Sequence, residues 1–398
     1  KKISGSRNIF KANVNSSAAK NAKTAGKEAA LAAAKGLDKV KLAFVYGSCG
    51  YDTDDMMSGV AEALPETAAL GNTSFTGIIT PEGFISSDDG FVGVMAFSGD
   101  DLTVGTAGSP RGDDPFETGR KVALEAMKAA GMDKAPNFFY MAASPAEEEL
   151  YLKGISSVIG RVPFFGGSAA DNSISGDWKL YCGDKSFADG VIVAFFYGDL
   201  NLTNLFTGAY RETADCGVIT KVKGARTLCE IDGVPATEKY REWAGCSKEA
   251  VTGGNLLVTC VLSPLGVKDR LGDLIAIRHP MNGNEDGSMA VGNGLAEKTC
   301  VIRMEATVDE LISSTGQTLN ALLEKMAPAK PLAFHLVHCG GRRAGIGDRI
   351  DEVAAQIKKA AGDVPFIVEF TFGEYGYESD NNNTCGGLML SFSGFSTK

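Results

Sequence analysis

The sequence has few of the residues that usually build metal sites and disulfide frameworks. Its nine cysteines are scattered over 398 residues without a Cys-x-x-Cys pair, and its only histidines are His279, His335 and His338. An odd number of scattered cysteines is typical of reduced thiols in the cytoplasm. Because His335 and His338 lie an odd number of positions apart in one predicted strand, they face opposite sides of a sheet and cannot bind one ion together. We therefore expect no metal site.

Long apolar runs and basic clusters are also missing. No apolar run approaches the ~20 residues needed to cross a bilayer, and the first twenty residues lack the apolar core of a signal peptide. The formal net charge is −10 and no Lys/Arg cluster appears beyond the N-terminal segment, whereas a nucleic-acid partner requires a basic patch. We expect a soluble chain with no membrane span and no nucleic-acid partner.

Known catalytic signatures are absent as well. The sequence has no Gly-x-Ser-x-Gly elbow, no Walker A loop, no His-Glu-x-x-His motif and no Gly-x-Gly-x-x-Gly after a strand. Cys339 or Cys49 could pair with His335 or His338 as a nucleophile, but a cysteine at a strand end is more often a buried core residue. We therefore expect no catalytic residues, and we do not expect the protein to be an enzyme of a recognisable class.

What the sequence does contain is an internal repeat. Three buried-strand runs of similar sequence end in Ser or Cys: 42–49, 137–144 and 332–339. Each follows an amphipathic helical pattern, at 19–37, 115–130 and 308–326. Each precedes a second helix and a second apolar strand that ends in a glycine turn: 54–64 with 68–71, 146–159 with 162–167, and 347–361 with 364–373. The repeated unit is helix, strand, helix, strand.

Two further strands are expected to close each of the first two units as a hairpin: 77–79 with 90–97, and 178–181 with 190–196. A β-rich segment from Gly208 to Ala306 is inserted before the third unit, with short strands at 217–222, 256–262, 274–278 and 299–304 and a hairpin turn at 280–287. These patterns predict an α/β fold of repeated units in layered mixed sheets. We divide the chain into a polar segment with the first helix (1–40), a domain of two repeats (41–208) and a domain holding the β-rich segment and the third repeat (209–398).

Polar residues gather where the predicted strands end, which is where α/β proteins usually bind ligands. Arg342 with backbone N–H groups would suit a carboxylate, and Glu374 or Asp171 would suit an ammonium group, so the set fits a zwitterion. The structural alternative is that Gly71, Gly166, Gly167 and Gly373 supply positive φ and that Asp171 and Asn172 cap turns. The candidate ligand-binding residues are Ser48, Cys49, Asn72, Thr73, Ser74, Gly166, Gly167, Ser168, Asp171, Asn172, Cys339, Arg342, Gly373, Glu374, Asn383 and Thr384.

Several of these stretches together resemble the FIST family of sensory modules. The N-terminal part of the family is similar to Ala43-Phe-Val-Tyr-Gly-Ser48, Leu70-Gly-Asn-Thr-Ser74 and Val162-Pro-Phe-Phe-Gly-Gly-Ser-Ala-Ala-Asp-Asn172. The C-terminal part is similar to His338-Cys-Gly-Gly-Arg-Arg343, Val364-Pro365, Gly373-Glu374 and Asn383-Thr384. The resemblance covers roughly residues 41–394.

The resemblance implies a cytoplasmic module that binds a small ligand, with amino acids suggested for the family, and passes its state to a protein partner. No output domain occurs in these 398 residues, so we expect that partner to act in trans. Two alternatives stay open. Some relatives bind haem and respond to nitric oxide, which would make His279, His335 or His338 an axial ligand; otherwise we expect no cofactor. The chain could also be a structural protein that uses the fold as a scaffold in a larger assembly.

Overall fold

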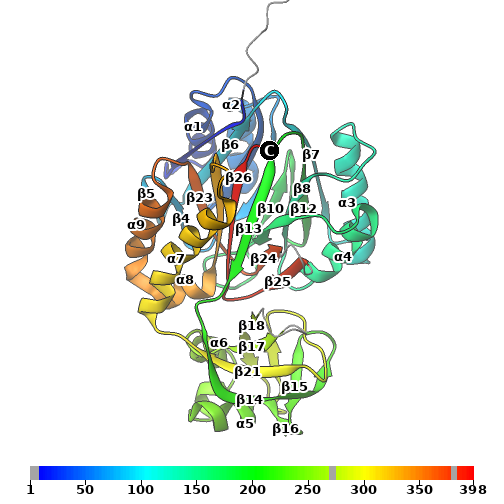
Figure 1. The fold of residues 1–398 in the computed structure, drawn as a ribbon, viewed down its shortest axis with the longest axis vertical. Helices are drawn as coiled ribbons and strands as arrows, with labels where there is room; N and C mark the ends of the chain where they lie inside the picture. The colour runs from blue at the N-terminus through cyan, green and yellow to red at the C-terminus, as the bar shows by residue number, and fades with distance from the viewer. Residues whose placement is uncertain (1–8, 269–274, 378–382) are drawn as a thin grey trace, which may run out of the picture.

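The computed structural model describes residues 9–268, 275–377 and 383–398. These residues form a large α/β body and a smaller β-rich lobe below it (Figure 1). Within them, the body contains three mixed sheets of six strands each. The mixed, layered α/β class predicted from the sequence is confirmed.

The three sheets are built on one plan. The first runs in the order β1 (Lys11–Ser17), β6 (Val92–Ser98), β2 (Val40–Gly47), β3 (Ala68–Thr73), β10 (Leu180–Cys182), β11 (Lys185–Phe187). The second runs β7 (Thr103–Pro110), β12 (Gly190–Tyr197), β8 (Phe138–Ala143), β9 (Phe164–Ser168), β24 (Glu374–Tyr377), β25 (Asn383–Gly386). The third runs β13 (Asn201–Thr207), β26 (Leu390–Ser396), β22 (Ala333–Cys339), β23 (Phe366–Thr371), β4 (Ile78–Thr80), β5 (Gly83–Ile85).

The closing hairpins differ from the sequence prediction in their partners. We expected 77–79 to pair with 90–97, but β4 pairs with β5 and with β23 of the third sheet, while β6 pairs with β1 and β2. Likewise β10 pairs with β11 and with β3 of the first sheet. Each unit therefore lends a short hairpin to the sheet of another unit. This exchange links the three sheets around a common centre, and no local sequence signal specifies it.

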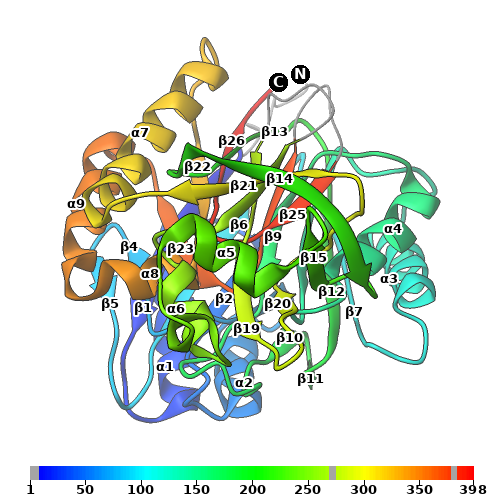
Figure 2. The same cartoon turned by 90° about the horizontal axis from the view of Figure 1, so that it is seen from below.

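Paired helices cover the outer faces of the sheets: α1 (Ala22–Ala34) with α2 (Thr53–Ala63), α3 (Pro115–Ala129) with α4 (Glu148–Ile159), and α7 (Val308–Met326) with α9 (Ile350–Ala361). Seen from the lobe, the three pairs lie at three corners of the body (Figure 2). The start of α7 is fixed by a capping box between Thr307 and Glu310. Short helices α8 (Gly340–Ile346) and η2 (Gly347–Arg349) connect β22 to α9. The inner faces of the sheets meet over an aromatic core that includes Phe44, Phe165 and Phe395.

The lobe is the β-rich segment predicted before the third unit. Its strands are β14 (Arg211–Lys223), β15 (Thr227–Ile231), β16 (Val234–Pro235), β17 (Leu265–Lys268), β18 (Ile275–Arg278), β19 (Pro280–Gly283), β20 (Met289–Val291) and β21 (Cys300–Glu305). Its helices are α5 (Ala236–Ala244), η1 (Glu249–Val251) and α6 (Asn255–Cys260). The expected hairpin at 280–287 is present as β19 and β20. The expected strand at 256–262 is wrong, because Asn255–Cys260 is helical and buries Leu256 and Cys260 on one side. Leu274, the first residue of another expected strand, lies outside the described residues.

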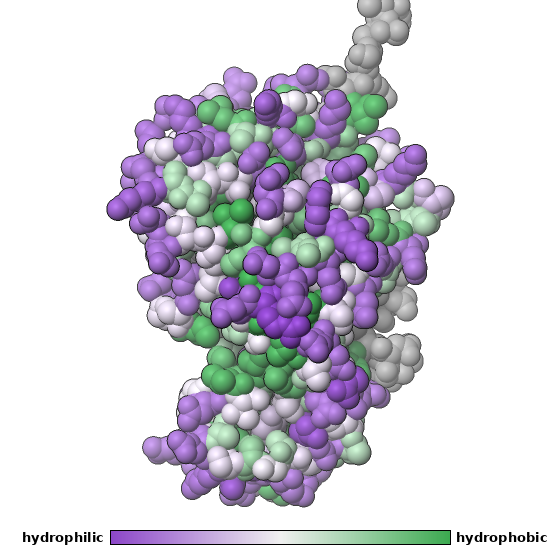
Figure 3. Space-filling model, turned by 90° about the vertical axis from the view of Figure 1, so that its left-hand side faces the viewer, coloured by the Kyte–Doolittle hydropathy of each residue, from purple (hydrophilic) through white to green (hydrophobic). Residues whose placement is uncertain are grey.

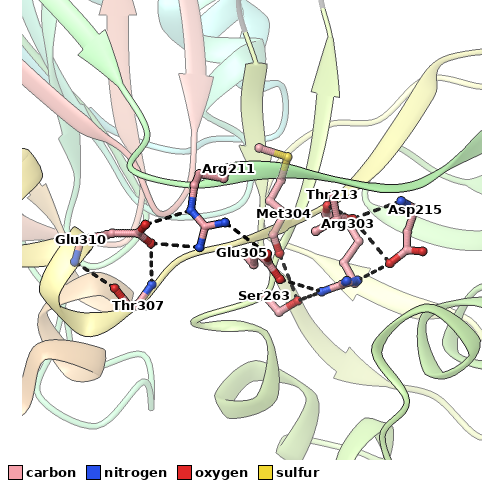
Figure 4. Close-up of polar contacts among 9 residues, drawn as sticks. All are labelled: Arg211, Thr213, Asp215, Ser263, Arg303, Met304, Glu305, Thr307 and Glu310. Atoms are coloured by element: carbon pink, nitrogen blue, oxygen red, sulfur yellow. Dashed lines mark hydrogen bonds and ion pairs between the residues drawn. The ribbon is translucent and has the colours of Figure 1, made fainter.

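Two chain segments and their charged side chains join the lobe to the body. Arg211 at the start of β14 bonds to Glu305 at the end of β21 and to Glu310 on α7 (Figure 4). On the lobe side, Arg303 bonds to Asp215 at 2.7 Å. Figure 3 shows apolar side chains gathered at the waist between the two parts. No helix in the described part of the chain is long and apolar enough to cross a membrane.

Candidate functional site

The three parallel strand pairs end at one place in the body, where their loops are bonded to one another. Backbone N–H groups of each unit donate to carbonyls of another: Phe75 to Phe370 (3.0 Å), Ala170 to Thr73 (3.0 Å), Ser168 to Gly373 (2.8 Å) and Phe372 to Ser168 (3.2 Å). The strand ends predicted to carry the site therefore do meet. We describe below which of the predicted side chains remain available for a ligand.

The hydroxyl groups of the first unit are used within these loops. Ser48 Oγ accepts from the N–H two residues further on at 3.1 Å. The Ser74 hydroxyl donates to the carbonyl of Gly77 at 2.7 Å, and Thr73 Oγ1 accepts from the N–H of Lys179 at 2.9 Å. All three side chains are buried. These bonds hold the loops together.

Asp171 and Asn172 also act inside the protein. The buried Asp171 carboxylate accepts backbone N–H groups from five successive residues, 173–177. Asn172 Oδ1 accepts from the N–H of Thr76 at 2.8 Å. Cys49 lies half-buried nearby, and burial raises the pKa of its thiol. The structural alternative fits Asp171, which caps the turn that follows it, whereas Asn172 bonds to the loop of the first unit.

Asn72 belongs to a ring of polar side chains at the centre of the body, which we call the axial ring. Its members are Tyr46, Asn72, Tyr140, His335 and Glu369, and all are fully buried. His335 Nε2 lies 2.5 Å from Tyr46 Oη, which donates to Tyr140 Oη at 3.3 Å. Tyr140 donates to Asn72 Oδ1 at 3.0 Å, and Asn72 Nδ2 donates to Glu369 Oε2 at 2.8 Å. If His335 Nε2 carries the proton, it donates to Tyr46, and the hydroxyls of Tyr46 and Tyr140 each donate one hydrogen bond. The donors then follow one another in a single direction from His335 to Glu369.

The axial ring is uncharged near neutral pH. Burial raises the pKa of Glu369 to about 8 and lowers the pKa of His335 to about 3. Although His335 Nε2 and Glu369 Oε1 are 3.6 Å apart, the two groups do not form an ion pair, because both are neutral at pH 7. The hydrogen bonds of the ring join the three sheets, while two of its buried atoms, His335 Nδ1 and Glu369 Oε1, have no partner.

A second cluster lies where the body meets the lobe. Ser168 Oγ donates to Glu148 Oε1 at 2.8 Å and contacts Tyr375 Oη at 2.8 Å. Arg226 of the lobe bonds to Glu148 at 2.5 Å and to Glu149 at 2.6 Å. Glu148 is 1% exposed, and burial raises the pKa of its carboxyl. These contacts fix the position of the lobe on the body.

The glycines of the predicted site mainly allow neighbouring segments of the chain to approach the backbone closely. Among Gly71, Gly166, Gly167 and Gly373, only Gly166 has a positive φ in the left-handed region, at +131°. A Cβ on Gly373 would lie 2.7 Å from Ser168 Oγ, and a Cβ on Gly167 would lie 2.8 Å from the carbonyl oxygen of Gly373. The alternative that these glycines supply positive φ therefore applies only to Gly166. At the other three positions, neighbouring segments of the same chain occupy the space that a side chain would need.

Cys339 and Glu374 lie together beside the start of α8. Cys339 Sγ accepts N–H groups of Gly341 (3.2 Å) and Leu388 (3.3 Å), and burial raises the pKa of the thiol. That environment does not activate a nucleophile. Glu374 accepts from Thr371 Oγ1 at 2.9 Å and from the N–H of Met389 at 2.8 Å. Burial raises the pKa of Glu374 to about 8, so its carboxyl is largely protonated at pH 7.

Arg342, on α8, is a fully buried cation with unused donors. Nη2 donates to the carbonyl of Leu311 at 3.1 Å and to Ser314 Oγ at 2.6 Å. Nε and Nη1 are buried without a hydrogen-bond partner. Among the described residues no carboxylate lies in ion-pair contact with Arg342; burial lowers its pKa, and Glu374 is close enough to act on it. A buried guanidinium without a counter-ion is costly, which makes Arg342 the most unusual group of the predicted set.

A buried amide of the lobe lies near the same place. Asn293 is 1% exposed, and both atoms of its amide lack a partner. A Cβ on Gly387 would lie 3.2 Å from Asn293 Oδ1, and the next residue, Leu388, bonds to Cys339. Asn293 therefore borders the segment 387–389 from the lobe, and Glu374, which accepts from the N–H of Met389, borders it from the body. We call Arg342, Glu374 and Asn293 the junction site.

Asn383 and Thr384 do not belong to the junction site. The Asn383 amide donates to the carbonyl of Val162 at 2.9 Å, just before β9 begins, whereas Ser168 is the last residue of that strand. Thr384 is half-buried beside it on β25. The structure thus brings Ser168, Cys339, Arg342, Gly373 and Glu374 together and leaves these two at the other end of the sheet.

Sequence reasoning missed Tyr46, Tyr140 and Glu369 of the axial ring and Arg226 and Asn293 of the lobe. A carboxylate in the middle of the apolar run 366–370 is a signal that could have pointed to Glu369. The two tyrosines carry no such signal, because aromatic residues are common in buried strands. Arg226 and Asn293 become visible only when the lobe is placed against the body.

The haem alternative needs a histidine as an axial ligand, and all three histidines are buried. His335 is in the axial ring, His338 Nδ1 contacts the carbonyl of Cys339 at 2.9 Å, and His279 Nε2 contacts the carbonyl of Leu257 at 2.9 Å. Burial lowers the pKa of His338 to about 3 and that of His279 to about 4. In the part of the chain that is described, no group of three or more His, Cys, Asp or Glu side chains could hold a metal ion.

The sequence matches two family domains that together cover most of the chain. Residues 41–234 match the FIST N domain, and residues 236–377 match the FIST C domain. The chain therefore belongs to the FIST family, whose domains are sensory domains of signal transduction, and the resemblance noted from the motifs is confirmed.

Solved structures of other proteins show distant similarity. Cyanuric acid hydrolase from A. caulinodans is 10% identical with a TM-score of 0.39, over 98% of this chain and 99% of that one. Phosphoribosylformylglycinamidine synthase II from Thermotoga maritima is 11% identical with a TM-score of 0.22, over 98% of this chain and 72% of that one. No curated protein sequence matches the chain.

Proposed function

We propose that this FIST protein is a sensor that binds a small carboxylate-bearing ligand at the junction site and passes its bound state to a protein partner. The observation that carries the proposal is the Arg342 guanidinium, which is fully buried with Nε and Nη1 unpartnered. Buried charges in proteins are normally paired, because an isolated one costs several kcal/mol. A ligand carboxylate would supply the missing counter-ion and accept a hydrogen bond from one of the two unused donors.

Amino acids are the first ligand class to test. Glu374 acts on the pKa of Arg342 and so lies close to it, with a pKa of its own raised to about 8. An ammonium group placed beside Glu374 would favour the ionised carboxylate and lower that pKa. A zwitterion would then satisfy both members of the junction site. Binding would also release a proton at pH 7, whereas binding of a plain carboxylate would not.

The position of the junction site suggests how ligand binding would be passed to a protein partner. Asn293 belongs to the lobe and Arg342 to the body, so a ligand at the site would contact both parts. Arg226 already ties the lobe to Glu148 and Glu149. We propose that the ligand changes how firmly the lobe is held and that the partner binds one of these states. The nine free thiols support an intracellular setting for this exchange.

Titration calorimetry with amino acids, the matched plain carboxylates and the matched amines tests the proposal. We expect heat only with compounds that carry a carboxylate. Arg342→Met should weaken binding at least ~30-fold, the equivalent of about 2 kcal/mol. The control is Arg343→Met, which removes the same charge one position away, where the guanidinium lies over the Phe84 ring.

Two buffers of different ionisation enthalpy separate the ligand classes in the same experiment. Amino acids should release close to one proton per ligand at pH 7, and Glu374→Gln should abolish that release. Binding without proton release would restrict the ligand to plain carboxylates. No binding by any carboxylate, or equal binding by Arg342→Met, would contradict the junction site itself.

A further inference from the structure

Two exposed cysteines lie near each other on one face of the lobe sheet. β14 and β21 are antiparallel, with Cys216 opposite Ile302 and Val218 opposite Cys300. Residues two apart on a strand share a face, so Cys216 and Cys300 are diagonal neighbours on the same face. Both are free and exposed, unlike the buried Cys339 of the junction site.

The spacing of such a pair suits a bridging ion better than a disulfide. Diagonal neighbours have Cα atoms roughly 7–8 Å apart, with side chains somewhat closer. A disulfide requires Cα atoms within about 6.8 Å, so this pair could not close one without moving the backbone. Two metal–sulfur bonds of about 2.3 Å each let the sulfur atoms stay up to about 4.6 Å apart. Side-chain rotation alone brings diagonal cysteines within that range.

A lysine places positive charge beside both thiols. β17 pairs with β21 so that Val267 is opposite Val301, and Lys268 therefore lies across from Cys300. Lys268 Nζ bonds to Glu212 Oε1 at 2.7 Å. Because residues opposite each other on paired strands share a face, Lys268 lies on the same face of the sheet as the two cysteines.

We propose that Cys216 and Cys300 form a two-thiolate site for a soft d¹⁰ cation of the Cu(I) type. Binding forms two sulfur–metal bonds and releases the two thiol protons to solvent. Two thiolates and one Cu(I) carry a net charge of −1, and both thiols are exposed, so the complex stays in contact with water. Thiolates select soft cations over hard ones, and a two-coordinate ion needs no third protein ligand. This site is independent of Arg342 and of the ligand proposed there.

Anaerobic titration of the intact, reduced chain with Cu(I) against a chromophoric Cu(I) chelator tests the proposal. The wild type should hold one equivalent that the chelator removes only at high concentration. Cys216→Ser and Cys300→Ser should each lose that equivalent while keeping the wild-type circular dichroism and melting temperature. Cys229→Ser, which alters a half-buried cysteine on β15 of the same lobe, should keep it. A double Cys216→Ser/Cys300→Ser variant that competes for Cu(I) as well as the wild type would overturn the proposal.

Discussion

Replacing Arg342 by methionine should make the unliganded protein more stable while it loses ligand binding. The substitution removes a buried charge that has no counter-ion and fills the space with an apolar chain of similar length. Leu311 and Ser314 keep a bond to each other, because the Ser314 hydroxyl donates to the Leu311 carbonyl at 2.9 Å. By analogy with buried charges replaced by apolar side chains, we expect the free energy of unfolding to rise by about 1–4 kcal/mol in urea at pH 7.

The direction of this change separates a ligand site from a structural one. A buried arginine that mainly holds the fold together loses stability when it is truncated, whereas a charge kept for a ligand costs stability until the ligand arrives. Arg343→Met is the matched control, since Arg343 is half-buried and bonds to the carbonyl of Gly347. A variant Arg342→Met that is less stable than the wild type would show that the guanidinium is compensated within the protein.

Glu369→Gln should stabilise the protein at neutral and alkaline pH and leave it unchanged in acid. Glutamine resembles the protonated carboxyl and can still accept the bond from Asn72 Nδ2. The folded-state pKa of Glu369 is raised from 4.5 to about 8, so the stability that its proton contributes is complete below pH 4.5 and is lost as the pH rises to 8. The upper limit of this loss is about 5 kcal/mol, because a tenfold change in an equilibrium is worth about 1.4 kcal/mol.

Urea unfolding of wild type and variant from pH 4 to pH 9 measures the effect. The buried histidines act in the opposite direction, because their lowered pKa values cost stability as the pH falls below 6.5, but they are the same in both proteins. The difference between the two curves therefore isolates Glu369. Glu352→Gln, at an exposed carboxyl whose pKa Arg349 lowers, is the control and should show no such rise. A difference that stays flat across the pH range would mean that Glu369 titrates normally in the folded protein.

The local pattern of apolar and polar residues predicted most helices and strands of the body. The predicted helix 308–326 has the observed bounds of α7, because its caps and its apolar spacing agree along the whole segment. Pairing could not be predicted in the same way. The hairpin β4–β5 pairs with β23, about 280 residues further along the chain. The short apolar runs that form it could pair equally well with β23 or with the strand of their own unit, so the sequence does not specify the partner. The run 256–262 was assigned to the wrong class because a short apolar segment fits a strand or a buried helix equally well.

The buried charges of the candidate site follow a pattern that the sequence shows, which is a charged residue shortly after an apolar strand. Arg342 and Glu374 follow apolar strands directly, and the structure places both in the buried core. Asp171 follows the same pattern, but five backbone N–H groups occupy its carboxylate, which no sequence pattern distinguishes from a ligand site. Asn293 was missed because its position depends on how the lobe sits on the body. Burial and hydrogen-bond partners, which the sequence does not give, decide between these cases.

Comparing the native mass with the denatured mass of freshly purified wild type and Arg342→Met tests the central claim most directly. We predict that the native wild type carries an added mass, lost on denaturation, that fits a small carboxylate, and that Arg342→Met carries none. An added mass of equal size on both proteins would contradict the claim that Arg342 holds the ligand.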